Sequence, residues 1–418
     1  MGRRYHVNRK LNLAVIGLGK RSSNLISVFQ KLIPGFRLAA VIDPDEDSAR
    51  RKLPSQSVNA HSTKFYSHID HLTKISNTLD GVLIGTPCNT HTPLAVNLAR
   101  LDLPVYLEKP VGITYQQIGD LNRAYGNSAN RVVVSFPLRS SPLFKTVLDI
   151  VHSGKLGKIN QIQAVNNVPY GAEYFGSTNY RNYDVTGGLW LQKATHDFDY
   201  INLLLGKPKA ITAMMTRQVY GGDMPHDLWC SKCDKSKICT ESPYSPDRTL
   251  YENANLVDHQ CVWGNKVLNQ DAGSALIMYE GGIHASYSQN FVSRLSSATR
   301  GAVITGYKAT VSFDWYTEKV KIIDHFKDKV EVVSVKGSRG GHHGGDEVLV
   351  NNFADVCFGV TDASPNLSDG LLSATMCLAA RESAHKQTWI AIPDINSHGF
   401  PESPTKLYQT APDIEPIP

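Results

Sequence analysis

The chain has 418 residues, of which 41% are hydrophobic and 19% charged. This composition is typical of a soluble globular protein and excludes a mainly disordered chain, and the length allows two domains. The net charge of +5 comes without a dense basic block, so we expect no nucleic-acid partner.

The first ten residues, MGRRYHVNRK, are basic. They run directly into the strand-like LNLAVIGLG and not into the apolar core of a signal peptide. We therefore expect no secretion signal, no membrane partner and a cytoplasmic location. In that compartment the seven cysteines are expected to be reduced.

The first predicted strand, residues 11–16, is followed by a glycine turn that opens a helix. The turn reads Gly-x-Gly-x-x-Ser from Gly17 to Ser22, one residue away from the dinucleotide-binding fingerprint. Gly17 permits a tight turn, Gly19 lets the backbone approach a pyrophosphate, and Ser22 is small enough for helix–strand packing. We expect the whole turn to bind a cofactor, which adds Lys20 and Arg21 to the candidate residues.

The second predicted strand, FRLAAVID, ends at Asp43. A carboxylate at this place accepts hydrogen bonds from the adenosine ribose and repels a 2′-phosphate, which favours NAD over NADP. Arg50 and Arg51 lie a short way along the chain and leave NADP open. A second interpretation is that Asp43 only caps the turn that follows.

Further strands are predicted in DGVLIGTP, LPVYLEKP and RVVVSFPLR, with helices between them. Strands that alternate with helices indicate a doubly wound parallel sheet, in which ligands bind at the carboxyl ends of the strands. The residues at those ends that we expect to contact the cofactor are Thr86, Asn89, His91, Glu108 and Lys109.

A second polar group lies in GGLWLQKATHDFDYINLLLG, which has helical spacing after the glycine pair. Lys193, His196 and Asp197 stand at i, i+3 and i+4, so Lys193 and His196 are predicted to share a helix face. The alternative is a solvent-facing Lys193 and a buried structural His196. In the later loop GGHHGGD, Asp346 is expected either to cap a helix or to contact a substrate.

Three cysteines form a C-x2-C-x5-C pattern at Cys230, Cys233 and Cys239. The first pair has the spacing of a metal-binding turn, and His226 or Cys261 would have to supply a fourth ligand. A structural zinc site, an iron–sulfur site and free thiols all stay open.

Several segments together resemble the Gfo/Idh/MocA oxidoreductases: AVIGLGKR, GTPCNTHTPLA, VYLEKPVG, FPLRSSPLFKTVLDIVHSGKLGKINQI and GGLWLQKATHDFDYINLLLGKP. The resemblance implies an α/β fold with a Rossmann domain, residues 1–138, and an α+β domain, residues 139–418, with an open, mostly antiparallel sheet. The active site would lie between them, and the cysteines would belong to an insertion at about 222–262. A homodimer or homotetramer is expected.

The resemblance also implies roles for single residues. Glu108 and Lys109 would lie beside the nicotinamide ribose and the reacting carbon, with a cis bond before Pro110, and His196 would face the substrate. Gln192 stands where many relatives have an acid, so Lys193 is a candidate second positive group. The remaining candidates for substrate contact are Arg139, Trp190, Asp197, His343 and Tyr174.

The predicted function is NAD-dependent hydride transfer from a ring CH–OH of a sugar, sugar acid or cyclitol, with Lys109, His196 and Lys193 as catalytic residues. One alternative is a glycosidase or lyase that oxidises, eliminates and re-reduces its substrate with recycled NAD. Another is a non-catalytic sensor of NAD and sugar. Stoichiometric NADH would favour the dehydrogenase, and aglycone release without net NADH the glycosidase.

Overall fold

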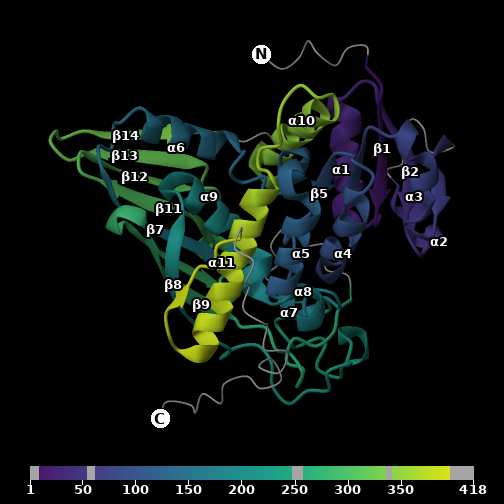
Figure 1. The fold of residues 1–418 in the computed structure, drawn as a ribbon. Coiled ribbons are helices and arrows are strands. Elements are labelled where there is room, and N and C mark those ends of the chain that lie inside the picture. The colour runs from purple at the N-terminus through teal and green to yellow at the C-terminus, as the bar shows by residue number, and fades with distance from the viewer. Residues whose placement is uncertain (1–8, 54–61, 247–257, 336–340, 396–418) are drawn as a thin grey trace. The chain divides into compact units, whose positions relative to one another are not determined.

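A computed structural model describes residues 9–53, 62–246, 258–335 and 341–395 (Figure 1). The chain divides into two compact units. Unit 1 comprises the described residues of 1–145, 336–375 and 394–401. Unit 2 comprises those of 146–335 and 376–393.

Unit 1 is built on a six-stranded sheet in the order β3-β2-β1-β4-β5-β6, and every described pair is parallel. This is the strand order of a dinucleotide-binding Rossmann fold. The strands are mostly apolar because a parallel sheet is buried on both faces. Their bounds are β1 (Leu11–Ile16), β2 (Phe36–Ile42), β3 (Lys64–Tyr66), β4 (Gly81–Ile84), β5 (Val105–Leu107) and β6 (Val132–Val134).

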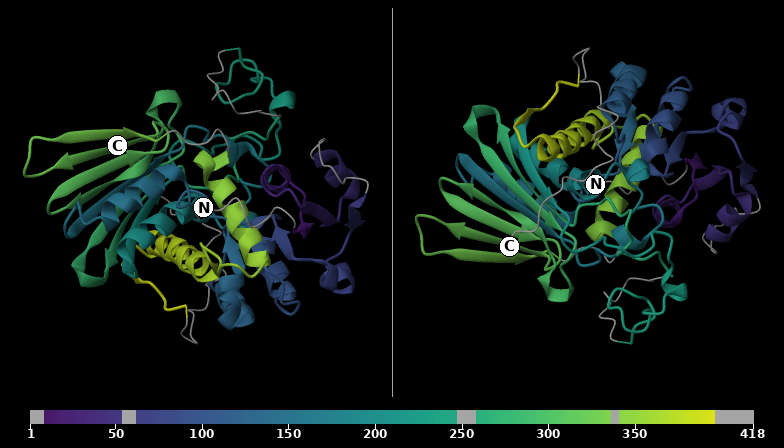
Figure 2. Two further views of the ribbon diagram at one scale, coloured as in Figure 1. Left: turned by 90° about the horizontal axis from the view of Figure 1, so that it is seen from above. Right: turned by 90° about the horizontal axis from the view of Figure 1, so that it is seen from below.

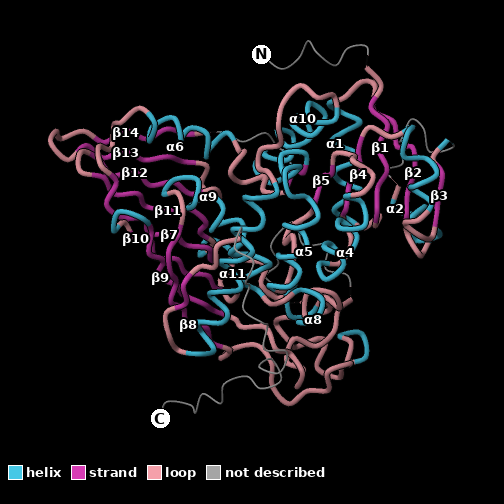
Figure 3. The backbone as a smooth tube through the Cα atoms, viewed as in Figure 1, coloured by secondary structure: helices cyan, strands magenta, loops and turns pink. Residues whose placement is uncertain are grey.

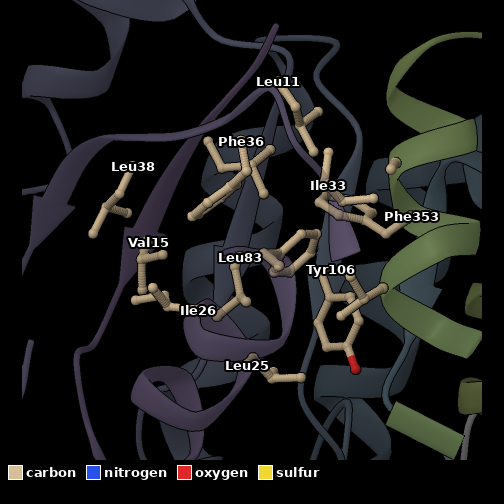
Figure 4. Packing of buried hydrophobic residues seen from close by; sticks show 14 of the residues in the cluster. Leu11, Val15, Leu25, Ile26, Ile33, Phe36, Leu38, Leu83, Tyr106 and Phe353 are labelled. Carbon is tan, nitrogen blue, oxygen red and sulfur yellow. The ribbon is translucent and has the colours of Figure 1, made fainter. Parts of the chain in front are cut away.

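The helices of unit 1 connect these strands and cover the sheet. They are α1 (Lys20–Leu32), α2 (Glu46–Lys52), α3 (His71–Ile75), α4 (Cys88–Ala99), α5 (Tyr115–Tyr125) and α10 (Gly345–Cys357). Phe353 of α10 packs edge-on against Phe29 and Tyr106, with ring centroids 6.2 and 5.6 Å apart. Figure 4 shows Phe353 among the core side chains. A helix far along the chain therefore completes the Rossmann core.

Unit 2 is built on a nine-stranded sheet in the order β14-β13-β12-β11-β7-β10-β9-β8-β15. Only β10 and β7 pair in parallel among the described pairs of this sheet. Figures 2 and 3 show its strands as one continuous twisted layer. The bounds are β7 (Ile159–Asn167), β8 (Pro208–Thr216), β9 (Ala272–Tyr279), β10 (His284–Asn290), β11 (Thr299–Gly306), β12 (Ala309–Asp314), β13 (Lys319–Asp324), β14 (Val330–Ser334) and β15 (Ile390–Ala391).

One face of this sheet is covered by α9 (Thr195–Leu205), whose Tyr200 ring packs against Phe313 and Trp315. Along β9 the residues alternate, with Ala275 and Ile277 buried and Leu276 and Met278 exposed, as a strand covered on one face requires. The short helices α7 (Glu173–Gly176) and α8 (Tyr183–Thr186) precede α9. Two of the places where the chain passes between the units lie within helices, namely α6 (Pro142–His152) and α11 (Leu367–Lys386).

The predicted fold class is confirmed: a parallel Rossmann sheet is followed by a mostly antiparallel sheet. The domain limits 1–138 and 139–418 stay predictions, and the compact units differ from them because α10 packs into the core of unit 1. In the described parts of the chain, no helix combines the length and the apolar character that crossing a membrane requires.

Candidate active site

The glycine turn after β1 has the geometry that the motif predicts. Gly17 has a φ of +80°, and an added Cβ would lie 2.5 Å from the Cγ2 of Thr86. A side chain at this position would be strained and would also collide with the next strand end. The chain therefore needs glycine at position 17, and the turn lies directly against Thr86.

The start of α1 is open to a ligand. Gly19 is the N-cap residue, no side chain caps the helix, and an added Cβ at Gly19 would meet no atom within 4 Å. The side chain of Lys20 is exposed, whereas Ser22 is fully buried where α1 passes close to Gly85. A helix start with unused N–H groups suits an anion such as a pyrophosphate.

Asp43 accepts hydrogen bonds from two segments of the backbone. One carboxylate oxygen accepts a hydrogen bond from the N–H of Leu18 at 2.9 Å, and the other accepts from the N–H of Asp45 at 3.0 Å. The side chain thus ties the end of β2 to the glycine turn and also caps the turn that follows. This places a carboxylate beside the turn, as the ribose contact requires.

Arg21 joins three segments that are far apart in the sequence. Its guanidinium donates to Glu108 at 2.7 Å and to both carboxylate oxygens of Asp346 at 2.6 and 2.8 Å. Ser135 accepts from the same guanidinium and donates to Glu108. Burial raises the pKa of Asp346, but hydrogen bonds from Arg21 and His342 outweigh it and hold the pKa well below its usual value. We call Arg21, Glu108 and Asp346 the unit 1 network.

The segment that carries Lys109 is fixed by the fully buried ring of His91. Its Nδ1 lies 2.8 Å from the carbonyl oxygen of Pro110, and its Nε2 lies 2.8 Å from that of Thr86. The Lys109–Pro110 peptide bond is cis, as the resemblance implied. His91 therefore connects two strand ends, which is a positioning role, and its direct contact with the cofactor stays a prediction.

In unit 2, the helix predicted after the glycine pair does not begin as a regular α-helix. Trp190–Ala194 forms a single π-helical turn before α9, and the N–H of Thr195 bonds to the carbonyl of Trp190 five residues back. The α-helical spacing behind the prediction that Lys193 and His196 share a face therefore does not hold at Lys193, and the shared face itself stays a prediction. Such π turns are frequent at functional sites.

The ammonium group of Lys193 is buried among aromatic rings. Its Nζ donates to the hydroxyl of Tyr170 at 2.7 Å and lies 4.5 and 4.9 Å from the ring centroids of Tyr170 and Tyr174. Burial, followed by the nearby charge of Arg300, lowers the pKa of Lys193 to about 7. The solvent-facing alternative for Lys193 is thus wrong, and the group is set to gain and lose a proton near neutral pH.

Asp197 lies at the centre of a buried polar group. Its carboxylate forms two 3.0 Å contacts with Arg300 and accepts hydrogen bonds from Tyr287 at 2.9 Å and from Asn166 at 3.0 Å. The carboxylate oxygens are therefore engaged inside the unit, and substrate contact by Asp197 finds no support. We call Asp197 and Arg300 the unit 2 network.

Other predicted substrate residues have identifiable roles in packing or pairing. Trp190 is buried between Phe198 and Tyr287, so its placement is explained by the core. Tyr174 packs against Tyr180 and Phe291 and contacts Lys193 as described above. Two of the predicted substrate residues belong to unit 1. Arg139 pairs with Asp369 at 3.2 Å, and His343 lies in the turn before α10.

His196 is buried near the start of α9, which agrees with the burial expected in the alternative of a structural histidine. Asn89, in the first turn of α4, accepts a hydrogen bond from Gln117 through its backbone carbonyl. The roles predicted for these two residues in catalysis and cofactor binding stay predictions. Lys109 belongs to unit 1, and Lys193 and His196 belong to unit 2.

The cysteines of the insertion are free thiols in the structure. Burial, followed by the neighbouring Cys261 and Cys239, raises the pKa of Cys230 to about 12. Among the described residues, no three His, Cys, Asp or Glu side chains are grouped so as to hold a metal ion. The prediction of a structural zinc ion at Cys230, Cys233 and Cys239 is therefore not supported.

Sequence reasoning missed Ser135, Arg300 and Tyr287, and it did not foresee that Arg21 pairs with Glu108. One signal was available: Asp197 stands in an apolar helix pattern, and a buried carboxylate needs a charged or hydrogen-bonding partner. The pattern does not identify that partner, because Arg300 lies 103 residues further along the chain.

Two family models match the chain in the order of its two sheets. Residues 11–136 match the model described as an oxidoreductase family with an NAD-binding Rossmann fold, and residues 144–312 match the C-terminal domain of the same family. The chain belongs to the Gfo/Idh/MocA oxidoreductase family. Its first domain is therefore an NAD-binding Rossmann fold, and the recognition from sequence motifs is confirmed.

Individual relatives agree with this assignment. The protein YteT of Bacillus subtilis (strain 168) is 24% identical over 382 residues, which cover 82% of this chain and 88% of that protein. The myo-inositol 2-dehydrogenase of Thermotoga maritima is 27% identical over 202 residues, 47% of this chain and 55% of that protein. A solved levoglucosan dehydrogenase with NADH and levoglucosan has a TM-score of 0.71 at 16% identity, over 92% of this chain and 100% of that one, and so shares the fold.

Proposed function

We propose that the protein is a dehydrogenase that removes a hydride from a ring CH–OH of a sugar, sugar acid or cyclitol and transfers it to NAD. The observation that carries the proposal is the Glu108–Lys109–Pro110 segment, which Arg21 and His91 fix at the end of β5. Two of the similar proteins are named as a myo-inositol dehydrogenase and a levoglucosan dehydrogenase, which supports a sugar or cyclitol as the substrate.

The residues of unit 1 fit a bound dinucleotide. Gly17, Gly19 and the start of α1 would hold the pyrophosphate, and Asp43 would bind the adenosine ribose. When bound, the nicotinamide accepts the hydride. The chain supplies the remaining functions, namely binding the substrate, orienting it and moving the proton.

We assign NAD rather than NADP to this site. A 2′-phosphate would approach the carboxylate of Asp43, which is unfavourable. Arg21 is committed to two carboxylates of unit 1. The guanidinium of Arg50 lies 3.9 Å from the ring centroid of Phe65 and pairs with Glu46, so both arginines have protein partners. An Asp43→Asn variant should lose at least part of its preference for NAD in kcat/KM.

In the proposed reaction Lys109 binds the reacting hydroxyl and stabilises the negative charge that develops on its oxygen. His196 orients the substrate. The hydroxyl of Tyr170 relays the proton to Lys193, whose Nζ lies 2.7 Å away and whose pKa of about 7 suits a proton acceptor at neutral pH. Tyr170 is only partly buried, so this pair is accessible from solvent.

The test is a panel of sugars, uronates, inositols and glycosides with NAD and with NADP, in which NADH formation and aglycone release are both followed. We expect one NADH for each substrate oxidised. Aglycone release without net NADH would contradict the proposal and favour a redox-assisted glycosidase. Full turnover by Lys109→Met on the same substrate would contradict the role of Lys109.

We also expect a homodimer or homotetramer. The face of unit 2 opposite α9 exposes large apolar side chains, with Met214 76% and Leu276 49% exposed. A second subunit would remove this surface from water. Light scattering after size-exclusion chromatography measures the mass, and a monomer at all concentrations would contradict this expectation.

A further inference from the structure

Four cysteines of unit 2 line one cavity that has no part in the proposed reaction. The cavity has a volume of about 280 Å³, and its lining includes Cys230, Cys233, Cys239 and Cys261. Three of them come from the C-x2-C-x5-C segment, and the fourth comes from beyond residue 257. The sequence left the choice of a fourth residue open between His226 and Cys261, and the cavity selects Cys261.

Backbone hydrogen bonds hold the cysteines in these places. The N–H of Cys233 donates to the carbonyl of Cys230 at 3.2 Å, and the N–H of Cys239 donates to that of Lys235 at 2.9 Å. The N–H of Cys261 donates to the carbonyl of Leu228 at 2.7 Å. The arrangement is thus part of the fold of the insertion and does not depend on side-chain rotamers alone.

The other polar groups nearby are already engaged. Both ring nitrogens of His259 face backbone carbonyl oxygens, at 2.8 and 3.0 Å. The carboxylate of Glu241 pairs with Arg294 at 2.8 Å, and the ring of His226 contacts Arg181 at 3.1 Å. The four thiols therefore form the donor set. Four sulfur donors favour zinc or an iron–sulfur cluster.

The size of the cavity distinguishes these two cases. A zinc ion binds sulfur at about 2.3 Å and draws four thiolates tightly together, whereas the described side chains show no such grouping. The cavity, of about 280 Å³, is larger than a single ion needs. An iron–sulfur cluster is a larger body that holds its four thiolates further apart.

We propose that Cys230, Cys233, Cys239 and Cys261 bind a [4Fe–4S] cluster. The thiolates and the bridging sulfides give such a cluster a net negative charge, and Lys235 lines the same cavity. The cluster would stabilise the insertion, whose Val262 belongs to one core cluster with Tyr220, Phe175 and Phe291. Because metal binding to cysteines couples to folding, its effect would be structural.

The first experiment measures the metal directly. The full chain is produced in iron-supplied cells and purified without oxygen, and iron, acid-labile sulfide and zinc are determined per chain. We expect roughly four iron and four sulfide atoms per chain, together with visible absorption that dithionite bleaches. One zinc per chain without sulfide, no iron after reconstitution with iron and sulfide, or a disulfide among these cysteines would each overturn the proposal.

Variants test the ligand assignment. Cys261→Ser and Cys233→Ser are expected to lose most of the iron and the visible absorption. Cys357→Ser, a matched change of a cysteine in α10 of unit 1, is expected to retain both. Cys233 is only partly buried, so this variant is expected to fold. Full iron content in Cys233→Ser and Cys261→Ser would show that the cluster is held elsewhere.

Discussion

The two units each contain an arginine that pairs with carboxylate inside its own unit and a candidate catalytic lysine, but the charges around the arginine differ. In the unit 1 network Arg21 pairs with two carboxylates, Glu108 and Asp346, which leaves one excess negative charge. In the unit 2 network Arg300 pairs with Asp197 alone, so the pair is neutral. The two networks thus differ in the number of carboxylates that pair with the arginine.

The surroundings of the two lysines also differ. Lys193 is buried near Arg300, and burial and repulsion lower its pKa to about 7 although the carboxylates of Glu173 and Asp197 act in the opposite direction. Lys109 follows Glu108, a member of the network that carries the excess negative charge. The lowered pKa suits Lys193 to proton exchange near neutral pH, and the binding of developing negative charge by Lys109 stays a prediction.

The largest effect is expected from Lys109→Met. It removes the group that stabilises the developing oxyanion, and we expect kcat/KM to fall roughly 10³-fold. Steady-state kinetics measures this loss. Lys31→Met, a matched change at a lysine whose side chain is 69% exposed and pairs with Glu347, should keep nearly full activity. An equal loss of activity in both variants would show that Lys109 has no specific role in catalysis.

Arg300→Met tests the unit 2 network through stability. It leaves the carboxylate of Asp197 buried without its cation, which costs about 3–5 kcal/mol of unfolding free energy. Urea unfolding measures the change. Adding Asp197→Asn should recover part of it, because the amide keeps hydrogen bonds available to Tyr287 and Asn166 without a charge.

Arg21→Met is the matched change in unit 1 and should cost less. The Arg21 side chain is 26% exposed, against 9% for that of Arg300, so its ion pairs are more screened by water, although Glu108 and Asp346 themselves are only 9% and 4% exposed. Because the depressed pKa of Asp346 contributes stability above the usual carboxyl pKa and loses it as the pH falls, the difference between Arg21→Met and the parent should shrink in acid. A larger loss for Arg21→Met would reverse this ranking.

The sequence predicts the two sheets and the glycine turn because these depend on local patterns. Gly17 needs a positive φ, and apolar strands alternate with helices. Both networks escape prediction, since their partners are far apart: Arg21 and Asp346 are separated by 325 residues, and Asp197 and Arg300 by 103. The π turn at Trp190–Ala194 also escapes prediction, because a π turn has no clear sequence signal.

The pH dependence of kcat/KM tests the role of Lys193, for which we expect a smaller effect than for Lys109. If Lys193 accepts the proton, kcat/KM should rise with pH and level off above about 7, because protonated Lys193 cannot act. Lys193→Arg keeps a positive charge at all these pH values, so it should be about 10²-fold slower and lack the inflection. A parent activity that instead falls as pH rises through this range would show that Lys193 acts as a cation.

An effect no larger than that of Lys193→Arg is expected from Tyr170→Phe, which leaves the aromatic ring beside Lys193 in place and removes the hydroxyl that relays the proton. We expect a loss of up to roughly 10²-fold in kcat/KM, the lower end of what a proton-transferring group contributes. Because the phenol accepts from the protonated lysine at 2.7 Å, its removal disfavours the charged form, and the inflection should move to lower pH. An inflection that stays unchanged would show that Tyr170 does not sense the proton on Lys193, and the relay would then have to be abandoned while the roles of Lys109 and Lys193 stood.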